Sequence, residues 1–178
     1  MNKRTRYAGG VAVLGTVAML AMTAGVQAAT FVYVANADSQ DISVLELDRP
    51  QGQLKPVETV AVAGTVMPMA VSADKRFLYA ALRSQPFRVT SFAIDGATGR
   101  LRKLGEAPLA DSMANIATDK SGRFLFAASY GGHKMSVSPI AADGTVGATT
   151  QVLPTGQNAH AAIPGPDNRS LFVTNLGS

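Results

Sequence analysis

From about residue 30 onward, short apolar runs alternate with clusters of Asp, Gly, Pro and Ser. Between Met69 and Leu109, for example, the runs are MAVSA, FLYAALR, FRVTSFAI and LRKLGEAPL, and the clusters between them are DKR, SQP and DGATGR. No run keeps apolar residues at helical spacing for long enough to form an amphipathic helix. Runs of this length, bounded by turn-forming residues, predict four short strands joined by hairpins.

The same pattern returns along the chain at a nearly constant interval. The aromatic residues Tyr33, Tyr79, Phe126 and Phe172 occupy equivalent places and are separated by 46, 47 and 46 residues. A four-stranded antiparallel sheet repeated at this period is typical of a β-propeller, in which each blade buries its faces by stacking on its neighbours. We therefore expect an all-β fold built from such blades.

The number of repeats sets the extent of this propeller. The 150 residues after position 28 provide about three blades, whereas closed propellers contain four to eight. The first copy, TFVYVAN, and the last, SLFVTN, both correspond to the second strand of a blade. We expect an incomplete propeller of about three blades, which needs further C-terminal blades or another copy of the chain to close.

The first 28 residues differ in composition from the repeats. Lys3, Arg4 and Arg6 precede the apolar run AGGVAVLGTVAMLAMTAGV, which leads into VQA at positions 26–28. A basic segment, an apolar segment and this type of ending favour a secretory signal peptide over residues 1–28, followed by one domain over 29–178. An uncleaved membrane anchor is the alternative, because the run is nearly long enough to span a bilayer. We expect a periplasmic or secreted protein without a stable membrane span.

Charge and composition exclude several classes of function. The chain has 16 basic and 12 acidic residues, but without residues 1–28 the balance is 13 to 12. A net charge of +1 provides no basic stripe for nucleic acid. Cysteine is absent, and the two histidines are not spaced as metal ligands are, so we expect neither a metal site nor a cofactor.

Strand order predicts which loops share one rim of the propeller. Loops from the second to the third strand lie on the same side as the crossings from one blade to the next. These loops carry polar side chains, and loop-borne polar groups on a rigid scaffold are where function is usually found. The residues concerned are Arg83, Asn115, Tyr130, His133 and His160, with Arg88 just beyond one loop.

With the repeats aligned, two stretches resemble a known family. VMPMAVSADKRFLYAALRSQPFRVTSFAID and AHAAIPGPDNRSLFVTN are similar to segments of the seven-bladed β-propeller lactonases, which include bacterial 6-phosphogluconolactonase and a carboxymuconate-lactonising enzyme. The resemblance extends from about Phe31 to the end of the chain and covers about half of a family member. It implies hydrolysis of a small-molecule lactone to a hydroxy acid, without metal or organic cofactor.

The resemblance also suggests roles for the loop residues. The family shows a histidine in the stretch that contains His160, which implies that this imidazole is the catalytic base. Arg83 and Arg88 match family arginines and are candidates for binding the anionic part of the substrate, and Asn115 and Tyr130 are further candidates for substrate contact. The alternatives are a channel-lining histidine, ordinary surface arginines, and a packing role for Tyr130. His133 is expected to face solvent.

Two functions remain open from the sequence. The first is an exported lactone hydrolase of the 6-phosphogluconolactonase type, acting on a phosphorylated or an unphosphorylated lactone. The second is a non-catalytic secreted propeller of the YVTN type that acts in binding or as a scaffold, because the segments VYVAN and LFVTN also occur in such proteins. An inactive truncated lactonase is a further alternative.

Overall fold

The computed structural model describes Met1 and residues 29–177, so the signal peptide expected over residues 1–28 lies almost wholly outside the described residues. The described residues form thirteen β-strands and no helix. This part of the chain therefore has no helix that could span a membrane. All strand pairs are antiparallel.

The strands form four separate sheets, which we call blades 1 to 4 in chain order. Blade 1 has three strands: β1 (Phe31–Asn36), β2 (Asp41–Asp48) and β3 (Gln53–Ala61). Blade 2 has four: β4 (Val66–Val71), β5 (Phe77–Leu82), β6 (Arg88–Ile94) and β7 (Leu101–Pro108). Blade 3 has four: β8 (Asn115–Thr118), β9 (Phe124–Ser129), β10 (Lys134–Pro139) and β11 (Gln151–Pro154). Blade 4 has two: β12 (Ala159–Pro164) and β13 (Leu171–Asn175).

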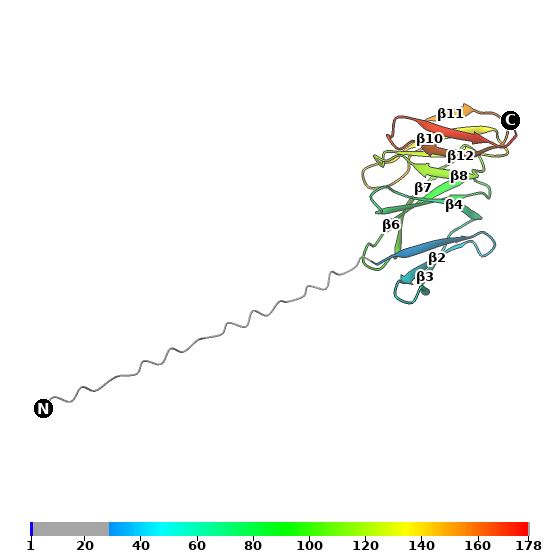
Figure 1. The fold of residues 1–178 in the computed structure, drawn as a ribbon. Coiled ribbons are helices and arrows are strands. Elements are labelled where there is room, and N and C mark those ends of the chain that lie inside the picture. The colour runs from blue at the N-terminus through cyan, green and yellow to red at the C-terminus, as the bar shows by residue number, and fades with distance from the viewer. Residues whose placement is uncertain (2–28, 178) are drawn as a thin grey trace.

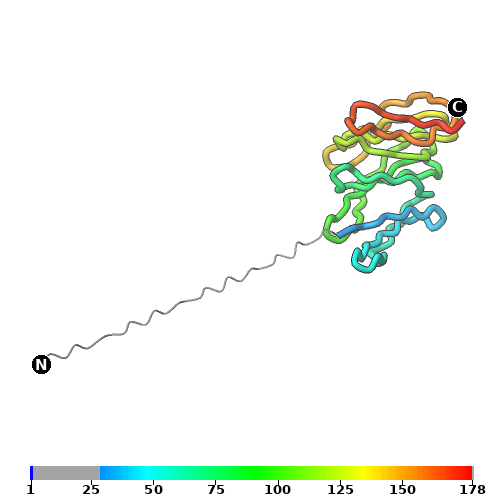
Figure 2. The backbone as a smooth tube through the Cα atoms, viewed as in Figure 1, coloured from blue at the N-terminus to red at the C-terminus, as the bar shows by residue number. Residues whose placement is uncertain are grey.

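The four blades are stacked face to face in chain order, from blade 1 at one end to blade 4 at the other (Figures 1 and 2). Within each blade, strands that are consecutive in the sequence are hydrogen-bonded neighbours in the sheet. Between blades, the first strand β8 lies beside the first strands β4 and β12. The prediction of an all-β, incomplete propeller of four-stranded blades is confirmed. Blade 1 contains the second to fourth strands, and blade 4 contains the first and second.

Apolar side chains fill the spaces between the blades. On β5, Leu78, Ala80 and Leu82 are buried against blade 1. Tyr79 and Ala81, which alternate with them, are buried against blade 3. A strand that is covered on both faces needs apolar residues at every position, which explains the unbroken run FLYAAL. Each large side chain buried in this way stabilises the fold by roughly 1.5–3 kcal/mol.

Exposure along the repeat shows how strongly burial depends on the next blade. Tyr79 is 1% exposed because blade 3 covers it, whereas the equivalent Phe172 on blade 4 is 60% exposed. Ile163 and Leu176 of blade 4 are also exposed. An aromatic residue at this position of the repeat therefore contributes to the core only where another sheet lies against it.

An aromatic ring on one blade also packs against a glycine on the next. The ring of Phe77 lies against Gly144, in the hairpin between β10 and β11, and the ring of Phe31 lies in the same way against Gly99 of blade 2. Both glycines have positive φ, +87° and +71°, and a Cβ on either would overlap the ring. The hairpin thus needs glycine both for its backbone conformation and for the space that the ring occupies. Phe124, at the equivalent place on blade 3, is 39% exposed.

A polar contact complements this packing between blades 3 and 4. The buried carboxylate of Asp119 accepts hydrogen bonds from the hydroxyl of Ser121, the amides of Arg123 and Phe124, and the side-chain amide of Asn168 on blade 4. Burial raises the pKa of Asp119, but these hydrogen bonds outweigh that effect and lower it from 3.8 to about 2.

The pKa of Asp119 predicts how stability depends on pH. Because the folded pKa lies below the unfolded one, this carboxylate stabilises the fold above about pH 4, and the contribution is lost as the pH falls towards 2. The contribution is roughly 2 kcal/mol. Chemical unfolding of wild type and Asp119→Asn should therefore give a gap in stability at pH 7 that narrows between pH 4 and pH 2. A gap that is constant over this range would contradict the assignment.

The contact between ring and glycine predicts a difference between two glycine variants. Gly144→Ala and Gly52→Ala both place alanine at a positive φ, +87° and +65°, but a Cβ on Gly52 meets nothing within 4 Å. Both should lose about 1 kcal/mol for the left-handed backbone. Gly144→Ala should lose at least about 1 kcal/mol more, because Phe77 must move. Urea unfolding measures both, and equal losses would show that the contact between blades contributes nothing.

Candidate functional site

The loops that were predicted to share a rim do so, and side-chain contacts join the two kinds of loop. We call this side the loop rim; it consists of residues 37–40, 83–87 and 130–133 and of the crossings 62–65, 109–114 and 155–158. Arg83, after β5, donates from Nε to the Ser112 hydroxyl in the crossing to blade 3 at 3.0 Å. His133, before β10, accepts a hydrogen bond from the amide of Asn158 in the crossing to blade 4. The loop rim is therefore one connected surface across blades 2 to 4.

His160 lies at the start of β12, the inner strand of blade 4. The register between β12 and β13 shifts between Ala159 and Ala161, so His160 is an extra residue without a partner on β13. Ala159 is fully buried against Ala128, while the His160 side chain is exposed. Such bulges are enriched beside active sites because they redirect a side chain. Here the bulge exposes the imidazole of His160 at the end of the inner strand β12 that adjoins the crossing 155–158.

Tyr130 is the aromatic neighbour of His160. Its ring, from the loop after β9, meets the imidazole edge to face, with centroids 6.0 Å apart and an interplanar angle of 85°. Tyr130 is 41% exposed, so part of its side chain is accessible to a small molecule. The structure therefore brings together two of the sequence candidates, one from blade 3 and one from blade 4.

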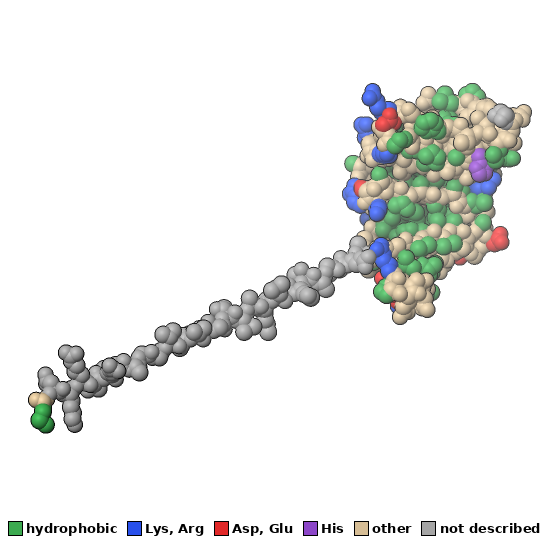
Figure 3. All heavy atoms as spheres, viewed as in Figure 1, with side chains coloured by type: hydrophobic (Ala, Val, Ile, Leu, Met, Phe, Trp, Pro, Cys, Tyr) green, Lys and Arg blue, Asp and Glu red, His purple; other side chains and the backbone are tan. Residues whose placement is uncertain are grey.

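His133 has a different environment on the same rim. Its backbone has a φ of +51°, and Asn158, whose amide donates to Nδ1 at 3.0 Å, has a φ of +59°. Because Nδ1 accepts a hydrogen bond, the neutral ring carries its proton on Nε2. His133 is exposed, as the sequence predicted, yet it also holds the crossing that leads to His160. Figure 3 shows histidine at this edge of the stack and most of the visible Lys and Arg side chains along the opposite edge.

Arg83 belongs to a polar group around the crossing from blade 2 to blade 3. Besides Ser112, its guanidinium contacts the sulfur of Met67 on the inner strand β4 at 3.3 Å. In the same crossing, Asp111 forms an ion pair of 3.3 Å with Lys134. Burial raises the pKa of Asp111, but the Ser112 amide, Lys134 and Ser129 lower it by a larger amount, so the carboxylate is ionised.

The other two candidates make contacts that hold blades together. Arg88 forms an ion pair of 3.2 Å with Glu106 and donates to the carbonyl oxygens of Ala63 and Pro86, and only 17% of its side chain is exposed. Its contacts thus lie within blade 2 and the crossing from blade 1 to blade 2. Asn115 accepts a hydrogen bond of 3.1 Å from the amide of Ala162, which joins the inner strands β8 and β12. Neither contact tests a role in substrate binding, which stays a prediction for both residues.

Sequence reasoning missed the residues that hold the crossings. Asp111, Ser112, Lys134 and Asn158 fix the loop rim through the contacts above. Asn adopts the left-handed conformation more often than most other residues do, so the QN dipeptide before β12 was a weak local signal for Asn158. The pairing of Asp111 with Lys134 has no sequence signature, because 23 residues separate the two.

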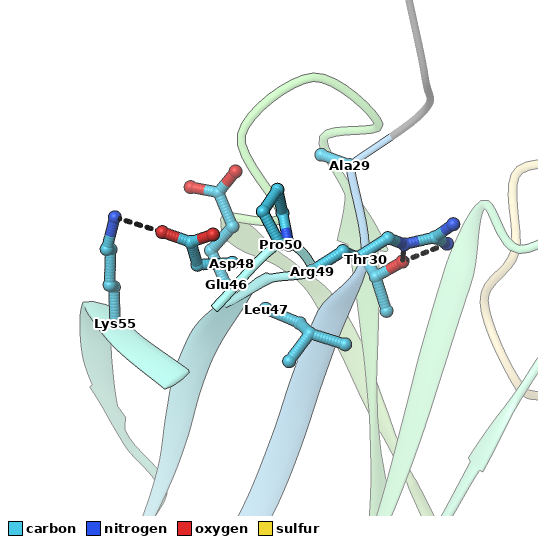
Figure 4. A pocket seen from close by; sticks show the side chains of 8 residues that line it. All are labelled: Ala29, Thr30, Glu46, Leu47, Asp48, Arg49, Pro50 and Lys55. Carbon is cyan, nitrogen blue, oxygen red and sulfur yellow. Dashed lines mark hydrogen bonds and ion pairs between the residues drawn. The ribbon is translucent and has the colours of Figure 1, made fainter. Parts of the chain in front are cut away.

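The hollows of the surface lie mainly away from this rim. One, of about 310 Å³, lies by the hairpin between β2 and β3 and contains the ion pair between Lys55 and Asp48 (Figure 4). Another, of about 360 Å³, lies between the hairpins of blades 2 and 3. Within residues 29–177, no group of three or more His, Asp or Glu side chains could hold a metal ion. The loop rim of these blades thus offers an open surface with an exposed imidazole.

The comparison with protein families accounts for this arrangement. The sequence model described as "Lactonase, 7-bladed beta-propeller" matches residues 27–178. The chain belongs to the seven-bladed β-propeller lactonase family. The resemblance seen in the sequence is thereby confirmed, and the blades described above are consecutive blades of the lactonase propeller.

Individual lactonases of this family are similar to the chain over most of its length. A 6-phosphogluconolactonase of Cronobacter sakazakii is 43% identical over 145 residues, which are 82% of this chain and 43% of that protein. A 6-phosphogluconolactonase of Pectobacterium carotovorum is 46% identical over 142 residues, 80% of this chain and 42% of that protein. The solved structure of a periplasmic gluconolactonase from Pseudomonas aeruginosa aligns with a TM-score of 0.72 and 25% identity, over 85% of this chain and 48% of that one. The chain thus spans less than half the length of these relatives.

Proposed function

We propose that the protein hydrolyses a lactone ring, with the loop rim as its active face. The observation that carries this proposal is the exposed imidazole of His160 on the bulge of an inner strand, in a chain that is 43–46% identical to relatives named 6-phosphogluconolactonase. The names of these relatives do not favour the alternative of a non-catalytic YVTN-type scaffold.

The chemistry needs a base, an acid and a site for negative charge. In the proposed reaction His160 accepts a proton from water as the oxygen of that water bonds to the lactone carbonyl carbon. The tetrahedral oxyanion then collapses and breaks the bond between the carbonyl carbon and the ring oxygen. The ring oxygen leaves as an alcohol after taking the proton from the imidazolium, and the product is a hydroxy acid. Tyr130, packed edge-on, restrains the ring of His160.

Arg83 is the candidate for stabilising charge at this face. Its Nε and one terminal nitrogen contact Ser112 and Met67. The remaining donors of the guanidinium suit an oxyanion, a carboxylate or a phosphate. Arg88 is paired with Glu106, so it is the second candidate for this role, after Arg83. Asn115 supports the inner strands from the same rim.

We further propose that the protein acts outside the cytoplasm. Residues 1–28 have the composition of a signal peptide, and a structural relative is a periplasmic gluconolactonase. Because sugar phosphates of central metabolism are cytoplasmic compounds, an unphosphorylated sugar lactone is the substrate that fits this location. The exposed faces of Phe172 and Ile163 would be covered by further blades, as in the longer relatives, or by another copy of the chain.

Variants of the two histidines test the catalytic proposal. His160→Ala should lower kcat for glucono-1,5-lactone by about a hundredfold or more, the usual contribution of a general base. His133→Asn is the matched control, because asparagine tolerates the positive φ and keeps an acceptor for Asn158. Rates are measured by acid release in a weakly buffered solution, with correction for spontaneous hydrolysis.

The same assay decides the substrate. Comparing glucono-1,5-lactone with its 6-phosphate should show a higher kcat/KM for the unphosphorylated ring if the proposed location is right. Equal rates for wild type and His160→Ala would remove His160 from the mechanism. Preference for the phosphate ester would contradict the extracytoplasmic assignment while leaving lactone hydrolysis intact.

A further inference from the structure

A concave surface lies on the rim opposite the loop rim. It is the hollow of about 360 Å³ between the hairpin that joins β4 to β5 on blade 2 and the hairpin that joins β8 to β9 on blade 3. Its walls include Arg76, Phe77, Arg123 and Ile140. A volume of this order suits a small ligand. Blades 2 and 3 are both complete four-stranded sheets, so this hollow does not depend on any blade outside the described residues.

Two arginines occupy the same position of the repeat on either side of this hollow. Arg76 precedes Phe77 and Arg123 precedes Phe124, and each guanidinium lies over the ring that follows it, at 5.0 and 5.9 Å from the centroid. The residues before the arginines, Lys75 and Gly122, have positive φ, +61° and +69°, which gives the two hairpins the same turn. Ring and turn together restrict where the guanidinium groups can lie.

The charges of these arginines are balanced unequally. Arg76 forms an ion pair of 2.6 Å with Asp74, which also lines the hollow. Arg123 donates from Nε to the Ser121 hydroxyl at 3.1 Å. Among residues 29–177 no carboxylate lies within ion-pair distance of its guanidinium. Hydrogen bonds from Ser72 and Arg76 lower the pKa of Asp74 to about 2, so the lining carries one net positive charge at neutral pH.

Part of the wall is apolar. Phe77, Ile140, Ala141 and Ala142 line the hollow together with the arginines, Asp74, Gly122 and the two serines Ser72 and Ser121. A ligand that fits would place an apolar body against these side chains and one negative group near Arg123. A planar carboxylate matches the paired donors of a guanidinium better than a spherical anion does.

We propose that this hollow binds a small organic carboxylate with an apolar body, between Arg76 and Arg123. The site is distinct from the loop rim and does not rest on the lactonase activity. The carboxylate of Asp74 repels a second negative group, so the ligand carries a single negative charge. Arg169, the equivalent residue of blade 4, does not line this hollow. It lines a neighbouring one, which Arg123 also borders, and takes no part in the proposed site.

Titration with benzoate tests the proposal on the full chain. Isothermal titration should give a saturable, one-to-one isotherm for the wild type. The neutral isostere benzamide, and benzoate added to Arg123→Gln, should both bind about tenfold or more weakly, since a charge-assisted hydrogen bond is lost in each case. Arg169→Gln is the matched control because it removes one arginine from the same rim, and it should bind benzoate like the wild type.

A variant that is expected to bind benzoate more tightly separates an effect on affinity from a folding defect, because a misfolded protein would bind benzoate more weakly. Asp74→Asn removes the negative charge from the wall and should tighten benzoate binding. The asparagine Oδ1 can still accept from the Ser72 hydroxyl and the Arg76 amide, while the bond from Arg76 Nε is lost and this donor becomes free for the ligand. Circular dichroism checks that each variant is folded. Absence of saturation for the wild type, equal binding by Arg123→Gln, or equal weakening by Arg169→Gln would overturn the proposal, the last by showing nonspecific attraction to positive charge.

Discussion

Burial of each sheet face against the next sheet is the constraint on which the structure depends. A single blade cannot cover its own apolar faces, so Tyr79 becomes core only because blade 3 lies against it. The ring of Phe77 on Gly144 and the carboxylate of Asp119 bound to Asn168 add directional contacts to this packing. The repeat in the sequence is the consequence, because every blade must offer its neighbour a similar surface.

The same stacking produces the candidate site. No single blade carries Tyr130 and His160 together; they meet because the end of β9 and the start of β12 reach the same rim of adjacent blades. The bonds from Asn158 to His133 and from Ala162 to Asn115 fix the offset between those blades. A shift of one blade against the next would therefore separate the imidazole from its aromatic neighbour. The rim bears chemistry only as long as the stack keeps its register.

The sequence predicted the blades well because their physical cause is local and repetitive. Turn residues and the spacing of aromatics such as Tyr33 and Tyr79 indicated the strands, the hairpins and the shared rim. The partners of individual side chains were not predictable, because they come from other blades. Arg88 remains a predicted anion ligand, but its pairing with Glu106 on the neighbouring strand had no signal in the sequence. The bulge at His160 likewise arises from the register with β13, which no local pattern specifies.

Native-state hydrogen exchange tests the stacking most directly, because it reports protection strand by strand. The account predicts the slowest exchange in β5 and β6 of blade 2, which is covered on both faces by blades 1 and 3. It predicts much faster exchange in β13 of blade 4, where Phe172 is exposed. Equal protection in these strands, or greater protection in β13 than in β5, would contradict the claim that stacking between blades stabilises this fold.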